Sequence, residues 1–339
     1  MKPERNSLGY LAWFLGTAVV LFGVAIGLSL FFKPLSGDLT RIGRWSERDF
    51  GPTRAQSPPV IRANGPLLRD QQILVLGDSF SNPNIWQSYL SESTKLDTLS
   101  FEFKDVGCIN NWVNWVVSQT ALEAKKIIIE VAERSFVPVF RNDRACTAST
   151  PVASKAFDKT SSAGLTQGIS LDAIYLFQTA GNTLRMRWQA GRINSGEVVS
   201  VPLASSNFFS NTKAKRLLYY AEDDNKKSWT QRDITAAIEN LKKIQSRLVK
   251  FRLVVVVVPD KSTVYRPYIL GLPDQIEHPD VFSALTASGI DSIDLRELFR
   301  EKVTSHIDLY LPNDTHLGPS GYHLMGAAIA ERLQSTGTK

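Results

Sequence analysis

The chain has 339 residues, 43% of them hydrophobic, and this size and composition suit one large domain with a full core better than several small ones. A fibrous or disordered protein is excluded. The formal net charge of +6 is spread along the sequence and is not concentrated in a block of lysines and arginines, so we expect no nucleic-acid partner.

The first element in chain order is an apolar segment, residues 8–32, that contains no charged side chain. About 25 residues at 1.5 Å per residue span the hydrocarbon core of a bilayer, so we predict a transmembrane helix. A cleaved signal peptide is the alternative, but the segment is long for one and residues 31–34 offer no small-residue cleavage site. We therefore expect residues 1–33 to be a membrane anchor. Basic residues flank both of its ends, so charge does not settle its orientation.

The next segment, residues 34–66, is rich in proline and arginine and shows little periodicity, which is typical of a stalk between a membrane and a domain. We expect the folded domain to occupy residues 67–339. Within it, apolar runs at 73–76, 126–131 and 253–258 have the length of buried strands, and helical stretches separate them.

The rest of the domain contains one clear helix and one irregular region. Thr230 and Asp233 resemble a capping box, and a helical apolar stripe follows them up to the third apolar run. This alternation predicts an α/β fold with a parallel sheet flanked by helices. Residues 147–225 are rich in Ser, Thr, Gly and Asn, and we interpret them as an irregular insertion or lid.

Cys108 and Cys146 are the only cysteines in the sequence. An even number permits one disulfide if the domain is exported, and two buried free thiols fit the sequence equally well. Neither cysteine belongs to a C-x-x-C pair, so the sequence does not indicate a redox motif or a cysteine metal site.

Three polar residues at the two ends of the domain predict its chemistry. The first apolar run leads into Gly-Asp-Ser, which places Ser79 at the carboxyl end of a strand, where open α/β sheets bind ligands. Alone, the triplet also fits an ordinary turn. Far along the chain, Asp314 lies two residues before His316, and a carboxylate there can orient the imidazole and stabilise its protonated form. We predict a triad of Ser79 as nucleophile, His316 as general base and Asp314 as the orienting carboxylate.

We expect no metal and no cofactor. An Asp-x-His pair without further clustered His, Cys or carboxylate residues is a poor metal signature.

Residues 77–81 (Gly-Asp-Ser-Phe-Ser) resemble the first block of the SGNH (GDSL-like) hydrolases, and residues 314–316 (Asp-Thr-His) resemble their last block. The closer resemblance is to the SGNH-like domains of alginate and exopolysaccharide O-acetyltransferases, whose paired residues read Asp-Thr-His. Residues 258–265 and 130–134 are similar to segments of that group. The resemblance covers most of residues 70–335 and implies an SGNH-hydrolase-like, flavodoxin-like sheet.

The chain departs from these families in two ways. The alginate enzymes have the Asp-x-His segment before the serine block, whereas here Ser79 comes first, as in ordinary SGNH esterases. Ordinary SGNH enzymes also complete the oxyanion hole with a glycine and an asparagine. Gly107 fits the glycine, but Glu133 and Arg134 stand where a Gly-x-Asn-Asp block is expected. We expect Ser79 and Gly107 to supply backbone N–H groups, and Arg134 either to add positive charge or to pair with Glu133.

Three further residues are candidates for substrate binding. Lys261 and Tyr265 follow the carboxyl end of a strand, so they either line an acceptor groove or belong to a solvated loop with a half-buried tyrosine. Trp112 either stacks on a sugar ring or packs in the core or an interface.

The triad and the resemblance together imply a serine acyl-enzyme that O-acetylates an exported polysaccharide through an acetyl-serine. The expected partners are the polysaccharide acceptor and a multi-span membrane O-acyltransferase that supplies the acetyl group. The expected location is the inner membrane, single-pass, with the catalytic domain in the periplasm. The alternatives are a carbohydrate esterase or deacetylase of the same fold and a non-catalytic polysaccharide-binding assembly subunit, although a binding subunit has no need of an intact triad.

Overall fold

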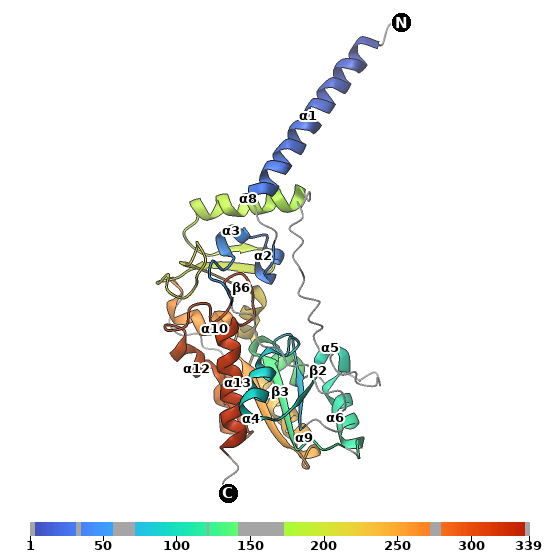
Figure 1. Cartoon of the computed structure of the whole chain (residues 1–339), viewed down its shortest axis with the longest axis vertical. Helices are drawn as coiled ribbons and strands as arrows, with labels where there is room; N and C mark the ends of the chain where they lie inside the picture. The colour runs from blue at the N-terminus through green and yellow to red at the C-terminus, as the bar shows by residue number, and fades with distance from the viewer. Residues whose placement is uncertain are drawn as a thin grey trace.

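The computed structural model describes residues 4–31, 35–56, 72–120, 122–141, 173–271 and 279–335. A long N-terminal helix leads to a small antiparallel sheet, and a larger α/β unit lies beyond that sheet (Figure 1).

The N-terminal helix, α1 (Glu4–Phe31), extends away from the rest of the protein. Its segment Gly9–Leu28 has 20 residues and a mean hydropathy of 2.2, and only 6% of an 18-residue apolar window is buried against other parts of the chain. A helix of this length and polarity either anchors a protein in a membrane or serves as a signal sequence.

A five-stranded sheet with the strand order β2-β1-β3-β7-β8 forms the centre of the α/β unit, and all of its neighbouring strands are parallel. Its strands are β1 (Ile73–Gly77), β2 (Thr98–Glu102), β3 (Lys126–Ala132), β7 (Arg252–Val258) and β8 (Ser292–Asp294). Apart from the first residue of β3 and of β7, the residues of the four longer strands are buried, because helices cover both faces. The predicted fold class, a parallel sheet flanked by helices, is confirmed.

Alternate residues of the strands face opposite layers of helices, as the period of a strand requires. Val75 and Ile128 belong to the core shared with one layer, and Leu76 and Ile129 belong to the core shared with the other. The first layer contains α4 (Ile85–Thr94), α12 (Leu295–Lys302) and α13 (Pro319–Gln334). The second contains α6 (Ile109–Ser118), α7 (Phe136–Phe140), α9 (Gln231–Arg247) and α11 (Val281–Ser288). The predicted capping box of Thr230 and Asp233 is present at the start of α9.

The small sheet corrects the prediction that residues 147–225 are irregular. The described part of this range forms α8 (Ala173–Trp188) and the antiparallel strands β4 (Ile193–Ser195), β5 (Val198–Pro202) and β6 (Arg216–Tyr220). These strands have only three to five residues, which is too short for a clear alternating pattern in the sequence. Residues 147–172 lie outside the described residues.

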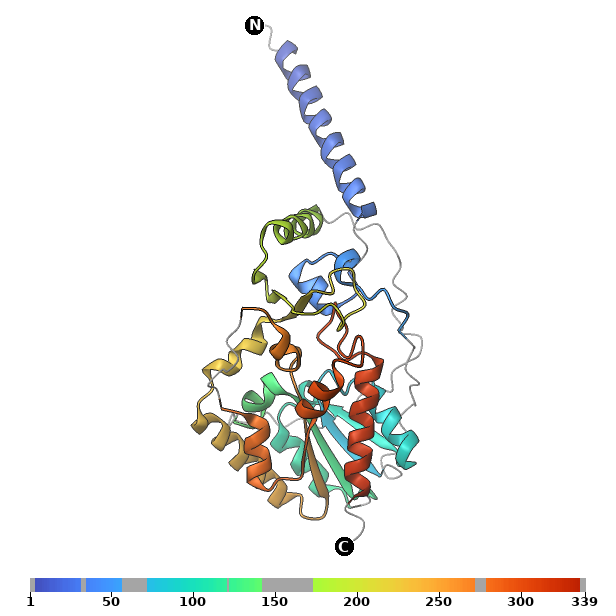
Figure 2. The same cartoon turned by 90° about the vertical axis from the view of Figure 1, so that its left-hand side faces the viewer.

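Residues 35–56 are likewise not the predicted stalk, because they pack into the body of the protein. They form α2 (Asp38–Gly43) and α3 (Glu47–Phe50), and Leu39, Trp45 and Phe50 are fully buried against one face of the small sheet. The other face of that sheet joins the core of the α/β unit. The small sheet therefore lies between α1 and the α/β unit and is packed on both sides (Figure 2). Residues 57–66 of the predicted stalk lie outside the described residues.

Candidate active site

Ser79 lies in an exposed turn at the carboxyl end of β1, as the sequence predicts. The side chain of Asp78 fixes this turn, because it accepts hydrogen bonds from the backbone N–H groups of Phe80 (3.0 Å) and Ala132 (2.8 Å). Gly77 is required for space, since a Cβ atom there would lie 2.3 Å from the hydroxyl oxygen of Ser81. The turn thus presents Ser79 at the edge of the sheet where ligands bind in this class of fold.

A buried carboxyl group on β3, that of Glu130, supports the same turn from below. Its Oε2 accepts hydrogen bonds from the Asp78 backbone N–H (3.1 Å) and the Ser81 hydroxyl (2.7 Å). Burial and the nearby charge of Asp78 raise the pKa of Glu130 well above its usual value. Glu130 was not among the predicted site residues; its signals in the sequence are a charged residue inside an apolar strand and its place at the start of residues 130–134, which resemble a segment of the O-acetyltransferase group.

Asp314 and His316 form a hydrogen-bonded pair, as the sequence predicts. Oδ1 of Asp314 lies 2.7 Å from Nδ1 of His316 and also accepts a hydrogen bond from the His316 backbone N–H at 3.0 Å. Burial alone would lower the pKa of His316, but the hydrogen bond and charge of Asp314 outweigh it and the pKa is raised. Burial would raise the pKa of Asp314, but the contacts with His316 outweigh it and hold that pKa well below its usual value.

The serine turn and the histidine loop meet through an aromatic contact. The ring of Phe80, the residue after Ser79, lies 5.1 Å from the imidazole of His316, measured between centroids. Because Nδ1 of His316 is engaged by Asp314, Nε2 is the ring nitrogen left for another partner, and the role of His316 as the base for Ser79 stays a prediction. Within the part of the chain that the structure describes, Ser79 and His316 are not yet hydrogen-bonded, and such a bond often tightens only when substrate binds.

The start of α2 holds the Asp314 loop from the side of the small sheet. The backbone N–H of Asp38 donates to Oδ2 of Asp314 at 3.1 Å. The backbone N–H groups of Leu39 and Thr40 donate to the carbonyl oxygen of Asn313 at 3.1 and 3.2 Å. The orienting carboxylate therefore has two supports, the imidazole on one oxygen and α2 on the other.

A buried carboxylate, that of Glu47 in α3, strengthens this junction. It accepts hydrogen bonds from the hydroxyl groups of Ser36 (2.6 Å) and Thr40 (2.5 Å) and from the side-chain amide of Asn313. Sequence reasoning missed these contacts because Ser36 and Glu47 are more than 260 residues from Asn313 along the chain.

The potential metal ligands at this site already have protein partners. One donor atom each of Asp38, Asp314 and His316 lies within 4.8 Å of the others. However, Asp314 is bonded to His316, and Asp38 forms an ion pair with Arg41 at 2.6 Å. This arrangement fits an orienting carboxylate and a base better than an open metal site, and the expectation of no metal stays a prediction.

Residues 215–339 match the family described as the SGNH hydrolase-like domain of the acetyltransferase AlgX. The resemblance to the SGNH superfamily is confirmed. The matched residues include Asp314 and His316, whereas Ser79 lies outside them. No curated protein matches the chain in sequence.

Two solved structures are similar to this chain at low identity. The lipase/acylhydrolase from Enterococcus faecalis is 11% identical, with a TM-score of 0.35 over 78% of this chain and 96% of that one. A second crystal structure is 15% identical, with a TM-score of 0.33 over 79% of this chain and 98% of that one.

Lys261 does not line an acceptor groove, as one reading of the sequence predicted, because its side chain is fully buried. Its Nζ donates to three backbone carbonyl oxygens of the histidine loop, those of Leu311 (2.7 Å), Pro312 (3.1 Å) and Asp314 (3.0 Å). Burial lowers the pKa of Lys261 to about 7. Lys261 is therefore a residue that positions the loop and not one that binds substrate.

Tyr265 and Trp112 are core residues, which corrects their predicted contact with substrate. Both have no exposed surface. The ring of Tyr265 packs against Phe209 at 4.8 Å, and the ring of Trp112 packs against Phe101 at 5.9 Å. Their position along the sequence is close to the strand ends, but their side chains point into the two cores.

Arg134 belongs to a buried cluster of charges. Its Nη1 lies 2.8 Å from Oδ1 of Asp260 and 3.6 Å from Oδ1 of Asp223. Glu133 pairs instead with Lys226, at 2.9 Å, so the alternative to an oxyanion role, a pair of Arg134 with Glu133, is not what the structure shows. Burial would lower the pKa of Arg134, but the carboxylates outweigh it and raise that pKa. Its charge is already balanced, which argues against a role in the oxyanion hole.

The remaining predicted site residues lie near the end of β2. Gly107 is exposed and has a positive φ of 74°, and β2 is the neighbour of β1 in the sheet, so Gly107 and Ser79 share the carboxyl edge. Their pairing as an oxyanion hole stays a prediction. Cys108 is disulfide-bonded, and its predicted partner, Cys146, lies outside the described residues, so their pairing also stays a prediction.

Proposed function

We propose that this chain is a serine acyl-enzyme that transfers an acetyl group to a hydroxyl of an exported polysaccharide. The observation that carries the proposal is the Asp314–His316 pair beside the turn of Ser79, with its 2.7 Å hydrogen bond. The matching family is that of an acetyltransferase domain, which supports transfer of an acetyl group.

In the first half of the reaction, Ser79 attacks the carbonyl carbon of an acetyl ester while His316 takes the hydroxyl proton. The backbone N–H groups of Ser79 and Gly107 stabilise the oxyanion, and Asp314 stabilises the imidazolium. The tetrahedral intermediate then expels the leaving group, which takes the proton from His316. Acetyl-Ser79 remains.

In the second half, a sugar hydroxyl attacks acetyl-Ser79 and gives its proton to His316. Collapse of the second intermediate releases the acetylated sugar, and the proton returns to Ser79. Water in place of the sugar gives hydrolysis. Two observations favour this esterase alternative: Ser79 is exposed to solvent, and the serine block precedes the Asp-x-His block as in ordinary SGNH esterases.

We further propose that α1 anchors the chain in the inner membrane with the remaining residues in the periplasm. The length and exposure of α1 support the anchor. The disulfide at Cys108 supports an oxidising compartment. An acetyl donor would then reach Ser79 from the membrane, and a multi-span O-acyltransferase is the partner that we propose.

The full chain in detergent should form acetyl-Ser79 with an activated acetyl ester such as p-nitrophenyl acetate, and mass spectrometry should detect it. Ser79→Ala should abolish the adduct and the turnover without changing the melting temperature, because the side chain is exposed and supports no packing. Unchanged turnover in Ser79→Ala would contradict the mechanism. Added oligosaccharide should divert acetyl from water to sugar, and hydrolysis alone with every acceptor would establish the esterase alternative.

A further inference from the structure

Helix α8 lies across the inner end of α1 (Figures 1 and 2). The two helices are in contact through a small apolar cluster in which Ala25 of α1 packs with Tyr175 and Leu176 of α8. Leu28 and Ala180 border the same cluster. If α1 spans a bilayer, this contact places α8 at the level where the span ends.

The outer face of α8 carries large apolar side chains that the described residues leave exposed. Phe177, Leu184 and Trp188 are 49%, 55% and 85% exposed. Their spacings of seven and four residues place them on one side of the helix. Thr179 and Asn182, on the opposite side, are buried against the body of the protein. The apolar face is therefore directed away from the body.

The charges around this face match a membrane surface. Arg185 and Arg187 flank Leu184 and Trp188. Helices that lie in the interface of a bilayer combine Trp, Phe and Leu on one face with Lys and Arg beside them. Tryptophan in particular is enriched at the level of the lipid headgroups.

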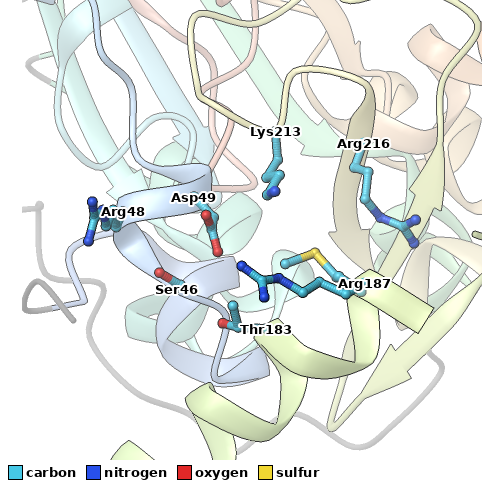
Figure 3. A pocket seen from close by; sticks show the side chains of 8 residues that line it. Ser46, Arg48, Asp49, Thr183, Arg187, Lys213 and Arg216 are labelled. Carbon is cyan, nitrogen blue, oxygen red and sulfur yellow. The ribbon is translucent and has the colours of Figure 1, made fainter. Parts of the chain in front are cut away.

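A pocket of about 300 Å³ opens along one flank of α8 and is strongly cationic (Figure 3). Arg48, Arg187, Lys213 and Arg216 line it, against the single carboxylate of Asp49. Thr183 and Arg187 bring α8 itself into its wall.

Four basic side chains and one carboxylate are among the residues that line this pocket. The guanidinium of Arg216 donates to oxygen atoms of Ser200, Ala190 and Gly191, none of which is a carboxylate. Partial burial raises the pKa of Asp49, and the charges of Lys213 and Arg48 act in the opposite direction. A site with this excess of cations suits an anionic group.

We propose that α8 lies in the membrane interface, with Phe177, Leu184 and Trp188 in the acyl-chain boundary, and that the cationic pocket binds the headgroup phosphate of an anionic phospholipid. The proposal rests on α1 as the membrane anchor, which is part of the proposed function. The occupant is a lipid because the apolar face adjoins the end of the span and the pocket lies on the same helix.

The depth of α8 is measured in the full chain, reconstituted in nanodiscs that contain phosphatidylglycerol. Three single variants carry an NBD label: Val19→Cys in α1, Leu184→Cys in α8 and Val249→Cys, an exposed position in the α/β unit. The wild-type chain, treated in the same way, gives the background. We expect lipids with a nitroxide on the acyl chain to quench the labels at 19 and 184 and to leave the label at 249 unquenched.

The labels at the three positions distinguish the proposed anchor, α1, from the proposed interfacial position of α8. An unquenched label at 19 would overturn the anchor and, with it, this inference. A quenched label at 19 with an unquenched label at 184 would overturn the interfacial position of α8 alone, and it would leave the exposed face for a protein partner.

The pocket is tested by native mass spectrometry of the full chain with phosphatidylglycerol. Arg187→Gln with Lys213→Gln should lower the retained lipid about 25-fold, because each basic residue near an anionic headgroup contributes about fivefold. Lys242→Gln with Lys250→Gln, exposed and outside the pocket, is the matched control and should retain the lipid. Equal retention in both double variants would overturn the lipid site. Displacement of the lipid by an equal concentration of inorganic phosphate would show a free-anion site and would also overturn it.

Discussion

At the scale of single residues, Asp314 controls both the direction and the basicity of His316. In the proposed mechanism only the neutral imidazole takes a proton from Ser79, so activity should fall as the pH falls below the pKa of His316. Asp314 raises that pKa. Removing the charge of Asp314 must therefore extend the acid side of the pH profile to lower pH, even though it harms catalysis.

We predict that Asp314→Asn lowers kcat by about 10⁴-fold, as expected when the orienting carboxylate of a Ser-His-Asp triad is lost. The acid limb of kcat/KM should move to lower pH. Both are measured with an activated acetyl ester over a range of pH. Asp291→Asn, a carboxylate in the Arg252 and Arg332 ion pairs, is a matched control and should leave the limb in place. If the acid limb of the kcat/KM profile stays at the same pH in Asp314→Asn, the assignment of His316 as the base is refuted.

Lys261 is the second residue whose removal has a defined consequence. Lys261→Met keeps the volume but removes one hydrogen bond from each of three backbone carbonyl oxygens of the histidine loop, of which that of Leu311 keeps a second donor, the Asp314 N–H at 3.3 Å. Each lost partner costs about 1 kcal/mol, so we expect the free energy of unfolding to fall by about 2 to 3 kcal/mol and kcat to fall with it. Thermal unfolding of Lys261→Met beside the exposed control Lys242→Met measures this. Equal melting temperatures would show that the three bonds contribute nothing.

Residues that interact over a short stretch of sequence were predictable, and those that interact over a long one were not. Asp314 and His316 lie two positions apart, so their contact could be predicted from spacing alone. Lys261 reaches carbonyl groups 50 to 53 positions away, and Asp38 reaches Asp314 across 276 positions. Nothing local in the sequence records such a contact, which explains why Lys261 was assigned to a groove.

At the scale of elements, α2 contributes to the candidate active site, although the sequence analysis predicted that its residues belong to a stalk. Its six residues are too few for a helical pattern, and Leu39, Trp45 and Phe50 do not repeat with the period of a helix or strand. Their burial depends on the small sheet, which the sequence also did not predict. The long, strongly apolar strands of the large sheet were predicted because burial on both faces makes them continuous apolar runs.

The contribution of α2 to the position of Asp314 can be tested by removing one backbone N–H group, that of Asp38. Asp38 is the first residue of the helix, where proline fits, and the extended backbone of Gly37 suits the position before proline. Asp38→Pro should therefore keep the helix but remove the N–H that donates to Asp314. A hydrogen bond to a charged group is worth about 1.5 to 3 kcal/mol, so we expect kcat to fall by about tenfold or more.

Asp38→Asn is the control, because it keeps the amide and removes only the charge. Since the carboxylate of Asp38 helps to raise the pKa of His316, this variant should shift the acid limb slightly to lower pH and keep most of kcat. Equal kcat values in the proline and asparagine variants would show that the amide of Asp38 does not support Asp314.

At the scale of the whole molecule, the redox state of the two cysteines reports on which side of the membrane the domain lies, because disulfides persist in oxidising compartments. We predict that neither Cys108 nor Cys146 reacts with a maleimide in the denatured, unreduced protein, and that both react after reduction. Mass spectrometry of protein isolated from membranes counts the added groups. Labelling of both thiols without reduction would contradict the bridge and remove the support that it gives to an exported domain.

The packing of the small sheet also has a consequence for the choice of acceptor. One of its faces holds α2 and α3, the other joins the core of the α/β unit, and α2 contacts Asp314 directly. With α1 in a bilayer, Ser79 is then held at a set height above the lipid and does not sample the surrounding space on a long tether. The enzyme would select its acceptor by distance as well as by chemical identity: a polymer that passes at that height is modified, and one that passes beyond it is not.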